Sequence, residues 1–178
     1  MIPVKVHKIT YYHPNRSYAV ILKEIGGNRK LPVLVGAFEA QAIAMALEYI
    51  ETPRPLTHDL IVNMIKEVDT NLSAVKITRL DDGVFYSVMN LQADRFGRRD
   101  IDSRPSDALA VALRLHVPIL VAEDVMTEAS IVELEEVESK SGRKKPRIEL
   151  LERQLQKAIE KEEYEIAARI RDKIKALE

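Results

Sequence analysis

Short segments of the chain either alternate apolar with polar residues or are continuously apolar, and these patterns predict β-strands. The segments are residues 4–10, 18–24, 30–35, 74–80, 84–91 and 118–122. Gly26-Gly-Asn28 joins the second segment to the third, and Asp81-Asp-Gly83 joins the fourth to the fifth. Both are turn sequences, so each predicts an antiparallel hairpin.

Apolar residues at helical spacing predict three helices in the same part of the chain. The helices are expected at residues 38–50, 57–68 and 103–116. Thr57 is a candidate N-cap for the second helix, and Pro105 suits the first turn of the third. Because helices and strands interleave without a regular βαβ repeat, we expect an α+β fold in which a mixed, mostly antiparallel sheet packs against helices.

The last part of the chain, residues 147–178, has a different pattern. Its apolar residues fall at helical spacing on both sides of the charged Lys161-Glu-Glu163. Two short antiparallel helices joined near this point fit the pattern, and so does one continuous amphipathic helix. A hairpin of this size buries little surface alone, so we expect it to dock on its own domain, a second copy or another protein.

Charge divides the chain near the same place. Residues 1–139 carry 15 basic and 20 acidic groups (net −5), whereas residues 140–178 carry 12 and 8 (net +4), which together give the net −1 of the whole chain. The polar segment 138–146 contains Gly and Pro and is typical of a linker. We therefore predict a domain over residues 1–137, a linker over 138–146 and a helical hairpin over 147–178.

Composition excludes several kinds of chemistry. The 178 residues include no Cys, so thiolate catalysis, disulfides and iron–sulfur clusters are ruled out. A net charge of −1 argues against a protein that coats DNA, and 5% aromatic residues leave few candidates for a surface that stacks bases. The N-terminus lacks an apolar signal sequence, and Arg114 and His116 interrupt the most apolar stretch, residues 108–122. We therefore expect a cytoplasmic protein with no membrane partner.

Polar residues gather where the second predicted helix begins. Arg54-Pro-Leu-Thr-His-Asp59 places His58 beside Asp59. Histidine at this point could act as a general base, the carboxylate could bind a metal ion, and Arg54 could bind phosphate. The pattern alone favours a structural interpretation, in which Thr57 caps the helix, Asp59 complements its dipole and His58 faces solvent.

A second cluster surrounds the start of the third helix. Asp102-Ser-Arg-Pro-Ser-Asp107 supplies two carboxylates, two hydroxyl groups and Arg104. The free N–H groups of a helix N-terminus favour an anion, which makes Arg104 and Ser106 candidate substrate-binding residues. The same residues would also serve as an N-cap. Glu39, near the start of the first helix, is a further candidate that the helix dipole alone would explain.

Together these residues offer what the hydrolysis of a phosphodiester requires: a proton acceptor, metal ligands and positive charge. The candidate catalytic residues are Glu39, His58, Asp59, Asp102 and Asp107, and the candidate substrate-binding residues are Arg54, Arg104 and Ser106. Asp59, Asp102 and Asp107 are the candidate ligands of a hard divalent cation, Mg²⁺ or Mn²⁺.

Three of these stretches resemble the signature blocks of the bifunctional nuclease domain family. In order along residues 1–135 they are Leu31-Pro-Val-Leu-Val-Gly36 followed by Glu39-Ala40, Arg54-Pro-Leu-Thr-His-Asp-Leu60 and Ile101-Asp-Ser-Arg-Pro-Ser-Asp-Ala108. The resemblance implies DNase and RNase activity and an α+β domain that is dimeric in bacterial members. DNA and RNA as substrates, and a homodimer, are accordingly expectations.

Residues 151–174 resemble a UVR motif, a helical hairpin that makes protein–protein contacts in subunits of the bacterial excision-repair nuclease. The distinguishing residues Tyr164, Ala167, Ala168, Arg171 and Asp172 are all present. The resemblance favours the hairpin over a single helix. It also implies a bacterial source and a protein partner for residues 147–178.

Two hypotheses follow for the function. The first is a metal-assisted nuclease of relaxed specificity that carries a protein-interaction hairpin, and the resemblance favours it. The second is a non-enzymatic adaptor or regulatory domain that binds an anionic ligand or a partner protein. The acidic first domain and the low aromatic content favour the second.

Overall fold

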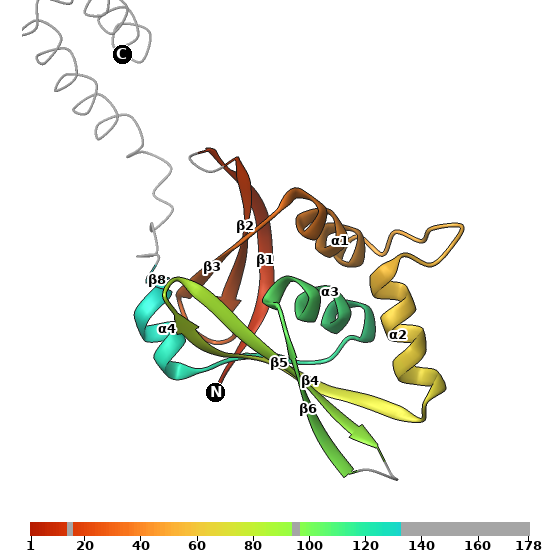
Figure 1. The fold of residues 1–178 in the computed structure, drawn as a ribbon. Helices are drawn as coiled ribbons and strands as arrows, with labels where there is room; N and C mark the ends of the chain where they lie inside the picture. Colours follow the sequence, from red (N-terminus) through yellow and green to blue (C-terminus); the bar gives the residue numbers. More distant parts are fainter. Residues whose placement is uncertain (14–15, 94–96, 133–178) are drawn as a thin grey trace, which may run out of the picture. The chain divides into compact units, whose positions relative to one another are not determined.

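A computed structural model of the chain describes residues 1–13, 16–93 and 97–132 (Figure 1). These residues form one eight-stranded sheet, with the strand order β6-β5-β4-β7-β1-β2-β3-β8, and four helices. All neighbouring strands are antiparallel except β4 and β7, which are parallel. The predicted α+β class is therefore confirmed for this part of the chain, whereas the predicted C-terminal hairpin lies outside the described residues.

The elements follow one another along the chain with short connections. The strands are β1 (Ile2–Tyr12), β2 (Ser17–Glu24), β3 (Arg29–Val35), β4 (Thr70–Asp81), β5 (Val84–Ala93), β6 (Gly97–Ser103), β7 (Ile119–Val121) and β8 (Ile131–Val132). The helices are α1 (Ala37–Leu47), α2 (Thr57–Glu67), α3 (Pro105–Leu115) and α4 (Glu123–Ala129).

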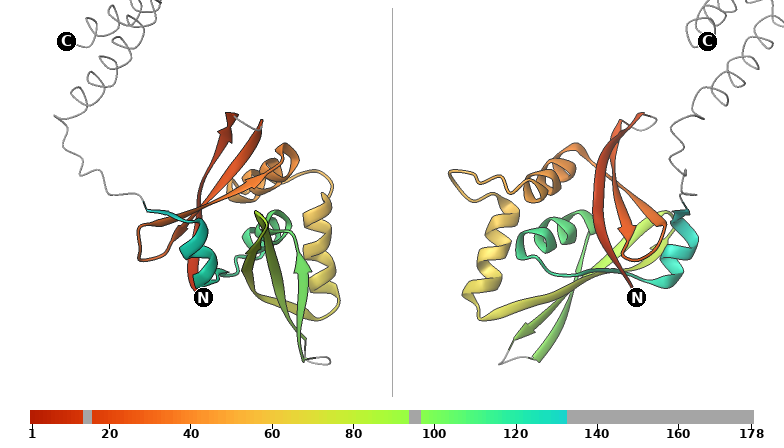
Figure 2. Two further views of the ribbon diagram at one scale, coloured as in Figure 1. Left: turned by 60° about the vertical axis from the view of Figure 1, so that its left-hand side comes forward. Right: turned by 180° about the vertical axis from the view of Figure 1, so that it is seen from behind.

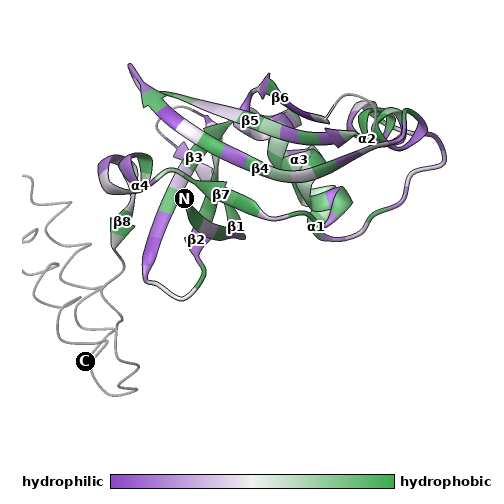
Figure 3. Cartoon of the chain, turned by 90° about the horizontal axis from the view of Figure 1, so that it is seen from below, coloured by the Kyte–Doolittle hydropathy of each residue, from purple (hydrophilic) through white to green (hydrophobic). Residues whose placement is uncertain are grey.

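Both predicted hairpins are present. β2 pairs with β3 and β4 pairs with β5, and the turn between β4 and β5 places Asp82 and Gly83 at φ angles of +48° and +77°. Consecutive residues in the left-handed region suit a tight two-residue hairpin, which is why Asp-Gly is a strong signal for this turn. Hydrophilic and hydrophobic positions alternate along β4 and β5 in Figure 3, as a strand with one buried face requires.

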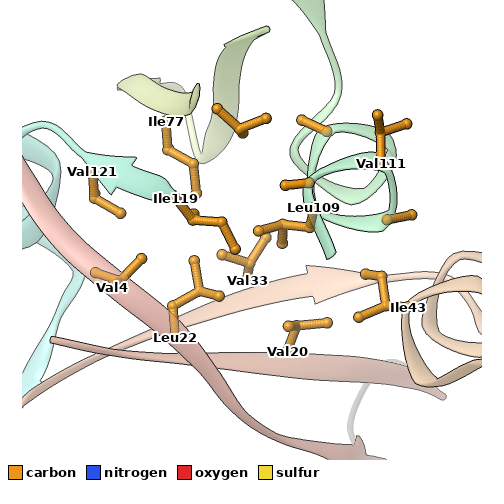
Figure 4. Packing of buried hydrophobic residues seen from close by; sticks show 14 of the residues in the cluster. Val4, Val20, Leu22, Val33, Ile43, Ile77, Leu109, Val111, Ile119 and Val121 are labelled. Atoms are coloured by element: carbon orange, nitrogen blue, oxygen red, sulfur yellow. The ribbon is translucent and has the colours of Figure 1, made fainter. Parts of the chain in front are cut away.

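Helix α3 lies at the centre of the domain. It contacts α1, α2, β4 and β5, and in Figures 1 and 2 it runs between α1 and α2 beside the sheet. Its segment from Ala108 to Ala112 is fully buried. Figure 4 shows Leu109 of this helix facing side chains from the sheet and from α1, including Val33, Ile43 and Ile77. Small residues on α3 let the neighbouring elements approach closely, which fixes the positions of the loops at its two ends.

The sequence patterns missed two elements and misplaced one cap. β6 was not predicted, because its sequence, GRRDIDS, lacks an apolar face. It is an edge strand with six of its seven residues exposed, so no apolar pattern is needed. Helix α4 was not predicted, because seven residues are too short to show a helical period. Leu56, not Thr57, is the N-cap of α2, and the Asp59 carboxylate accepts the Leu56 N–H instead.

None of the described helices is long and apolar enough to cross a membrane.

Burial of α3 predicts a large loss of stability when its core side chain is shortened. Leu109→Ala should lower the free energy of unfolding by about 2–5 kcal/mol, because Leu109 has no exposed surface and its removal leaves a cavity. Urea denaturation measures the change. The matched control is Ile25→Ala, since Ile25 is 56% exposed in the turn between β2 and β3 and its truncation should change stability by less than about 1 kcal/mol. Equal losses in both variants would contradict the position assigned to α3.

Candidate functional site

The first turn of α3 brings Arg104 and Asp107 together. Arg104 is the N-cap of the helix, and its guanidinium donates two hydrogen bonds to the Asp107 carboxylate. Nε lies 2.8 Å from Oδ2 and Nη2 lies 3.2 Å from Oδ1. A planar guanidinium matches a carboxylate in this two-pronged geometry, which fixes the direction of both side chains.

Helix α1 adds Glu39 to the same group. The third guanidinium nitrogen of Arg104, Nη1, lies 3.2 Å from Glu39 Oε1. The other Glu39 oxygen, Oε2, folds back over Gly36, where the Cβ of any larger residue would come within 2.5 Å of it. Glycine at the N-cap of α1 therefore leaves the space in which Glu39 reaches Arg104.

Helix α2 adds His58. Its Nε2 lies 3.2 Å from Asp107 Oδ1, and its side chain is 15% exposed, so it packs against α3 and does not project into solvent. With Nε2 engaged by Asp107, the other ring nitrogen, Nδ1, has no hydrogen bond to any described residue. A carboxylate that holds one ring nitrogen in this way fixes the orientation of the histidine ring. We call Glu39, His58, Arg104 and Asp107 the Asp107 cluster.

Two carboxylates share one guanidinium within the Asp107 cluster. Partial burial raises the pKa of Asp107, but hydrogen bonds from Arg104 and His58 outweigh this effect, and the net pKa lies below the ordinary value. Asp107, and Glu39 more weakly, raise the pKa of Arg104. Asp107 is therefore an anion at neutral pH, and the charge of Arg104 is shared between two carboxylates.

Asp59, the neighbour of His58, pairs with a residue that the sequence did not single out as functional. Arg114, in the last turn of α3, donates from Nε to Asp59 Oδ1 at 2.6 Å. Its Nη1 donates to two backbone carbonyls, Ala42 of α1 at 3.1 Å and Ala110 of α3 at 2.9 Å. One largely buried guanidinium thus ties the three helices that carry the Asp107 cluster. A basic residue within the most apolar stretch of the chain was the signal for it.

The remaining predicted residues lie elsewhere. Asp102 is exposed on β6, and the next residue, Ser103, turns its hydroxyl to the buried Ser87, so Asp102 faces the other side of the sheet. Arg54 is exposed in the loop between α1 and α2, and its guanidinium makes no hydrogen bond or ion pair with a described residue. Ser106 is 7% exposed, in the first turn of α3.

The three carboxylates expected to hold a metal ion are not gathered by the fold. Asp59 is held by Arg114, Asp107 is held by Arg104, and Asp102 lies on an exposed strand. Among the described residues no three His, Asp or Glu side chains are grouped so that they could hold a metal ion. This arrangement does not fit a cation shared by Asp59, Asp102 and Asp107.

Two parts of the chain match known protein families. Residues 20–133 match the family model of the bifunctional nuclease domain, and residues 146–178 match that of the UvrB/uvrC motif. An uncharacterized protein of Mycobacterium tuberculosis is 40% identical over 129 residues, which cover 72% of this chain and 76% of that protein.

Plant proteins match more distantly. Bifunctional nuclease 1 of Oryza sativa subsp. indica is 30% identical over 109 residues, and Bifunctional nuclease 2 of Arabidopsis thaliana is 26% identical over 106 residues. Each match covers 58% of this chain but only 32% of the plant protein.

The ion pair between Asp59 and Arg114 predicts a pH-dependent stability. Burial raises the pKa of Asp59, but Arg114 and the Leu56 N–H lower it by more, so the native pKa lies below the unfolded one. The contribution of the pair is therefore complete above about pH 4, the pKa of an unfolded Asp, and is lost as the pH falls through the native pKa. Asp59→Asn should cost about 1–3 kcal/mol at pH 7 and flatten this dependence.

Urea midpoints measured between pH 7 and pH 2 test this expectation. The control is Asp124→Asn, which removes an exposed carboxylate on α4 that has no ion pair with a described residue. A pH dependence in Asp59→Asn as steep as that of the unmodified chain would contradict the role of the pair.

Proposed function

Because this chain belongs to the bifunctional nuclease domain family, we propose that it is a nuclease that hydrolyses phosphodiester bonds in DNA and RNA with relaxed specificity. The observation that carries the proposal is the Asp107 cluster, in which side chains from α1, α2 and α3 meet around one carboxylate. Membership of a family does not by itself assign a reaction, so the role of each residue in the proposed hydrolysis is derived from the geometry of the cluster.

His58 is the proposed general base. Asp107 holds Nε2, which leaves Nδ1 to take the proton from the attacking hydroxyl group, a water molecule or the ribose 2′-OH. A new P–O bond then forms to the attacking oxygen as the P–O bond to the leaving oxygen breaks, and the leaving oxygen takes a proton from solvent. Asp107 stabilises the imidazolium that results, because a negative charge 3.2 Å away offsets the positive charge that the ring gains.

Arg104 is the proposed phosphate-binding residue. Its side chain is 67% exposed, and Glu39 is held by a single nitrogen, Nη1. A phosphodiester that takes the place of Glu39 at Nη1 would leave the two bonds to Asp107 intact. Arg104 would then remain fixed while it stabilises the negative charge that develops on the phosphoryl oxygens.

Substitution of His58 should remove most of the nuclease activity. His58→Gln keeps a polar side chain of similar size but cannot take up a proton, so kcat/KM on single-stranded DNA and RNA should fall by about 10²–10⁴-fold. His116→Gln is the matched control, since His116 is exposed at the C-terminal end of α3, outside the cluster, and its activity should stay within about twofold. Undiminished cleavage by a folded His58→Gln variant would overturn the assignment.

The same assay tests the expected divalent cation. Reactions with Mg²⁺, Mn²⁺ or EDTA reveal whether cleavage needs a metal ion. No cleavage under any of these conditions would favour the alternative of a non-enzymatic adaptor domain. For residues 146–178, which match the UvrB/uvrC motif, we propose a role in binding a protein partner.

We also propose that the chain forms a homodimer through α2. Leu56, Leu60, Met64 and Val68 follow one another every four residues, and they are 42–65% exposed. The series is symmetric about its midpoint, so an antiparallel second copy of α2 would place Leu60 against Met64 and Leu56 against Val68. Four large apolar side chains in one exposed stripe favour such a partner, and antiparallel helix dipoles attract each other.

Met64→Lys should therefore shift the protein from dimer to monomer in sedimentation experiments, because a buried charge would be left unpaired at the interface. Ile25→Lys is the control, as Ile25 is 56% exposed in the turn between β2 and β3. A monomeric unmodified chain, or a dimer that survives Met64→Lys, would contradict this interface.

A further inference from the structure

A groove of about 600 Å³ opens beside the Asp107 cluster, between β3 and the start of β5. We call it the β3–β5 groove. One of its ends is formed by Glu39, Arg104 and Ser106, and its walls are mainly apolar. Its size falls within the range of sites that hold a small molecule or one part of a larger ligand.

The walls of the groove offer apolar surface to a flat ring. Leu34 of β3 and Val84 of β5 are 48% and 55% exposed, and the rings of Tyr12 and Phe85 also line the groove. Aromatic residues are few in the chain, but two of them are brought to this one place by strands distant in sequence. An aromatic ligand between these walls would remove apolar surface from water and contact the side-chain rings.

The polar end of the groove contains Ser106, a largely buried residue. Ser106 is 7% exposed, lines the groove and makes no side-chain hydrogen bond to any described residue. A hydroxyl group on a largely buried residue that lines a groove and has no hydrogen bond within the protein can donate to or accept from a ligand. Ser106 also lies in the first turn of the 11-residue helix α3, whose N-cap side chain makes no capping hydrogen bond. The N–H groups of such a turn favour an anion.

The charges at this end limit what kind of anion fits. The positive charge of Arg104 is offset by the negative charges of Asp107 and Glu39, and the two carboxylates repel a free phosphate ion. A phosphate group would bind well only if another part of the same ligand contributed affinity. An aromatic base in the apolar part of the groove supplies that contribution.

We propose that the β3–β5 groove holds one unpaired base of the nucleic acid substrate, with the adjoining phosphate at Arg104 and Ser106. The inference rests on the proposed nuclease function and names its substrate as single-stranded. Bases within a duplex are stacked and paired, so their flat faces cannot enter the groove unless the base leaves the helix. The phosphate then lies at the guanidinium that also holds Asp107, next to His58.

Binding of labelled strands to the full chain tests the groove separately from cleavage. Three short probes of equal length are compared by fluorescence anisotropy in EDTA: a single-stranded DNA, its duplex, and a single strand in which every base is replaced by an abasic site. The single strand should bind about tenfold more tightly than either of the others, because only it offers a base to the apolar walls.

Three variants that each add one carboxylate locate the binding. Leu34→Glu places a carboxylate in the apolar wall and should raise the Kd of the single strand about tenfold, and Val84→Glu should do the same from the facing wall. Ile25→Glu adds the same charge at an exposed position outside the groove, so its Kd should change by less than about twofold. Both Leu34 and Val84 are about half exposed, so their substitution should leave the fold intact.

Each contrary result has a definite meaning. If the abasic strand binds as tightly as the normal single strand, or if the Kd is unchanged in both wall variants, the groove does not bind a base. Cleavage by the unmodified chain would still support the proposed nuclease activity in that case. Binding that follows the predicted pattern without any cleavage would support the groove as a nucleotide-binding site and overturn the proposed reaction. If none of the three probes binds, the proposal that the groove holds a base is wrong.

Discussion

The burial of α3 is the constraint on which the rest of the domain depends. The helix contacts α1, α2 and two strands of the sheet, and its middle turns are closed to solvent. Because it cannot turn or slide without exposing that surface, the residues at its ends have fixed positions. Arg104, Ser106 and Asp107 stand at the first turn and Arg114 at the last. The helix thus fixes the centre of the candidate site at one end and, at the other, the residue that ties α1 and α2 in place.

The two arginines of α3 use their charge differently. Arg114 is 12% exposed, and its hydrogen bonds go to Asp59 and to backbone carbonyls, so its charge is committed to holding the helices together. Arg104 is 67% exposed and shares its charge between two carboxylates. Solvent near Arg104 lowers the cost of exchanging one partner for another, whereas exchange at Arg114 would leave a buried charge. Of the two, Arg104 is therefore the one suited to meet a substrate.

Much of the fold could be predicted from the sequence, because its signals are local. The hairpin turn at Asp82-Gly83 and the helical period of α2 and α3 depend on neighbouring residues alone. β6 could not be predicted, since an exposed edge strand is defined by its pairing with β5. Four of the candidate residues, Glu39, His58, Arg104 and Asp107, do meet. Asp102 does not meet them, because side chains alternate along β6 and Asp102 lies on the other face of the sheet. The contact between Arg114 and Asp59 could not be predicted either, since the two residues are 55 positions apart in the sequence and no local pattern relates them.

The start of α3 separates the two tasks that a nuclease needs. Successive residues of a helix point about 100° apart, so Ser106 and Asp107 face different neighbours. Ser106 lines the β3–β5 groove, whereas Asp107 receives His58 from α2. Arg104 precedes both and contacts Asp107 while it also lines the groove. A phosphate at Arg104 would therefore lie beside the groove, which could hold a base, and beside Asp107, which holds the proposed proton acceptor His58.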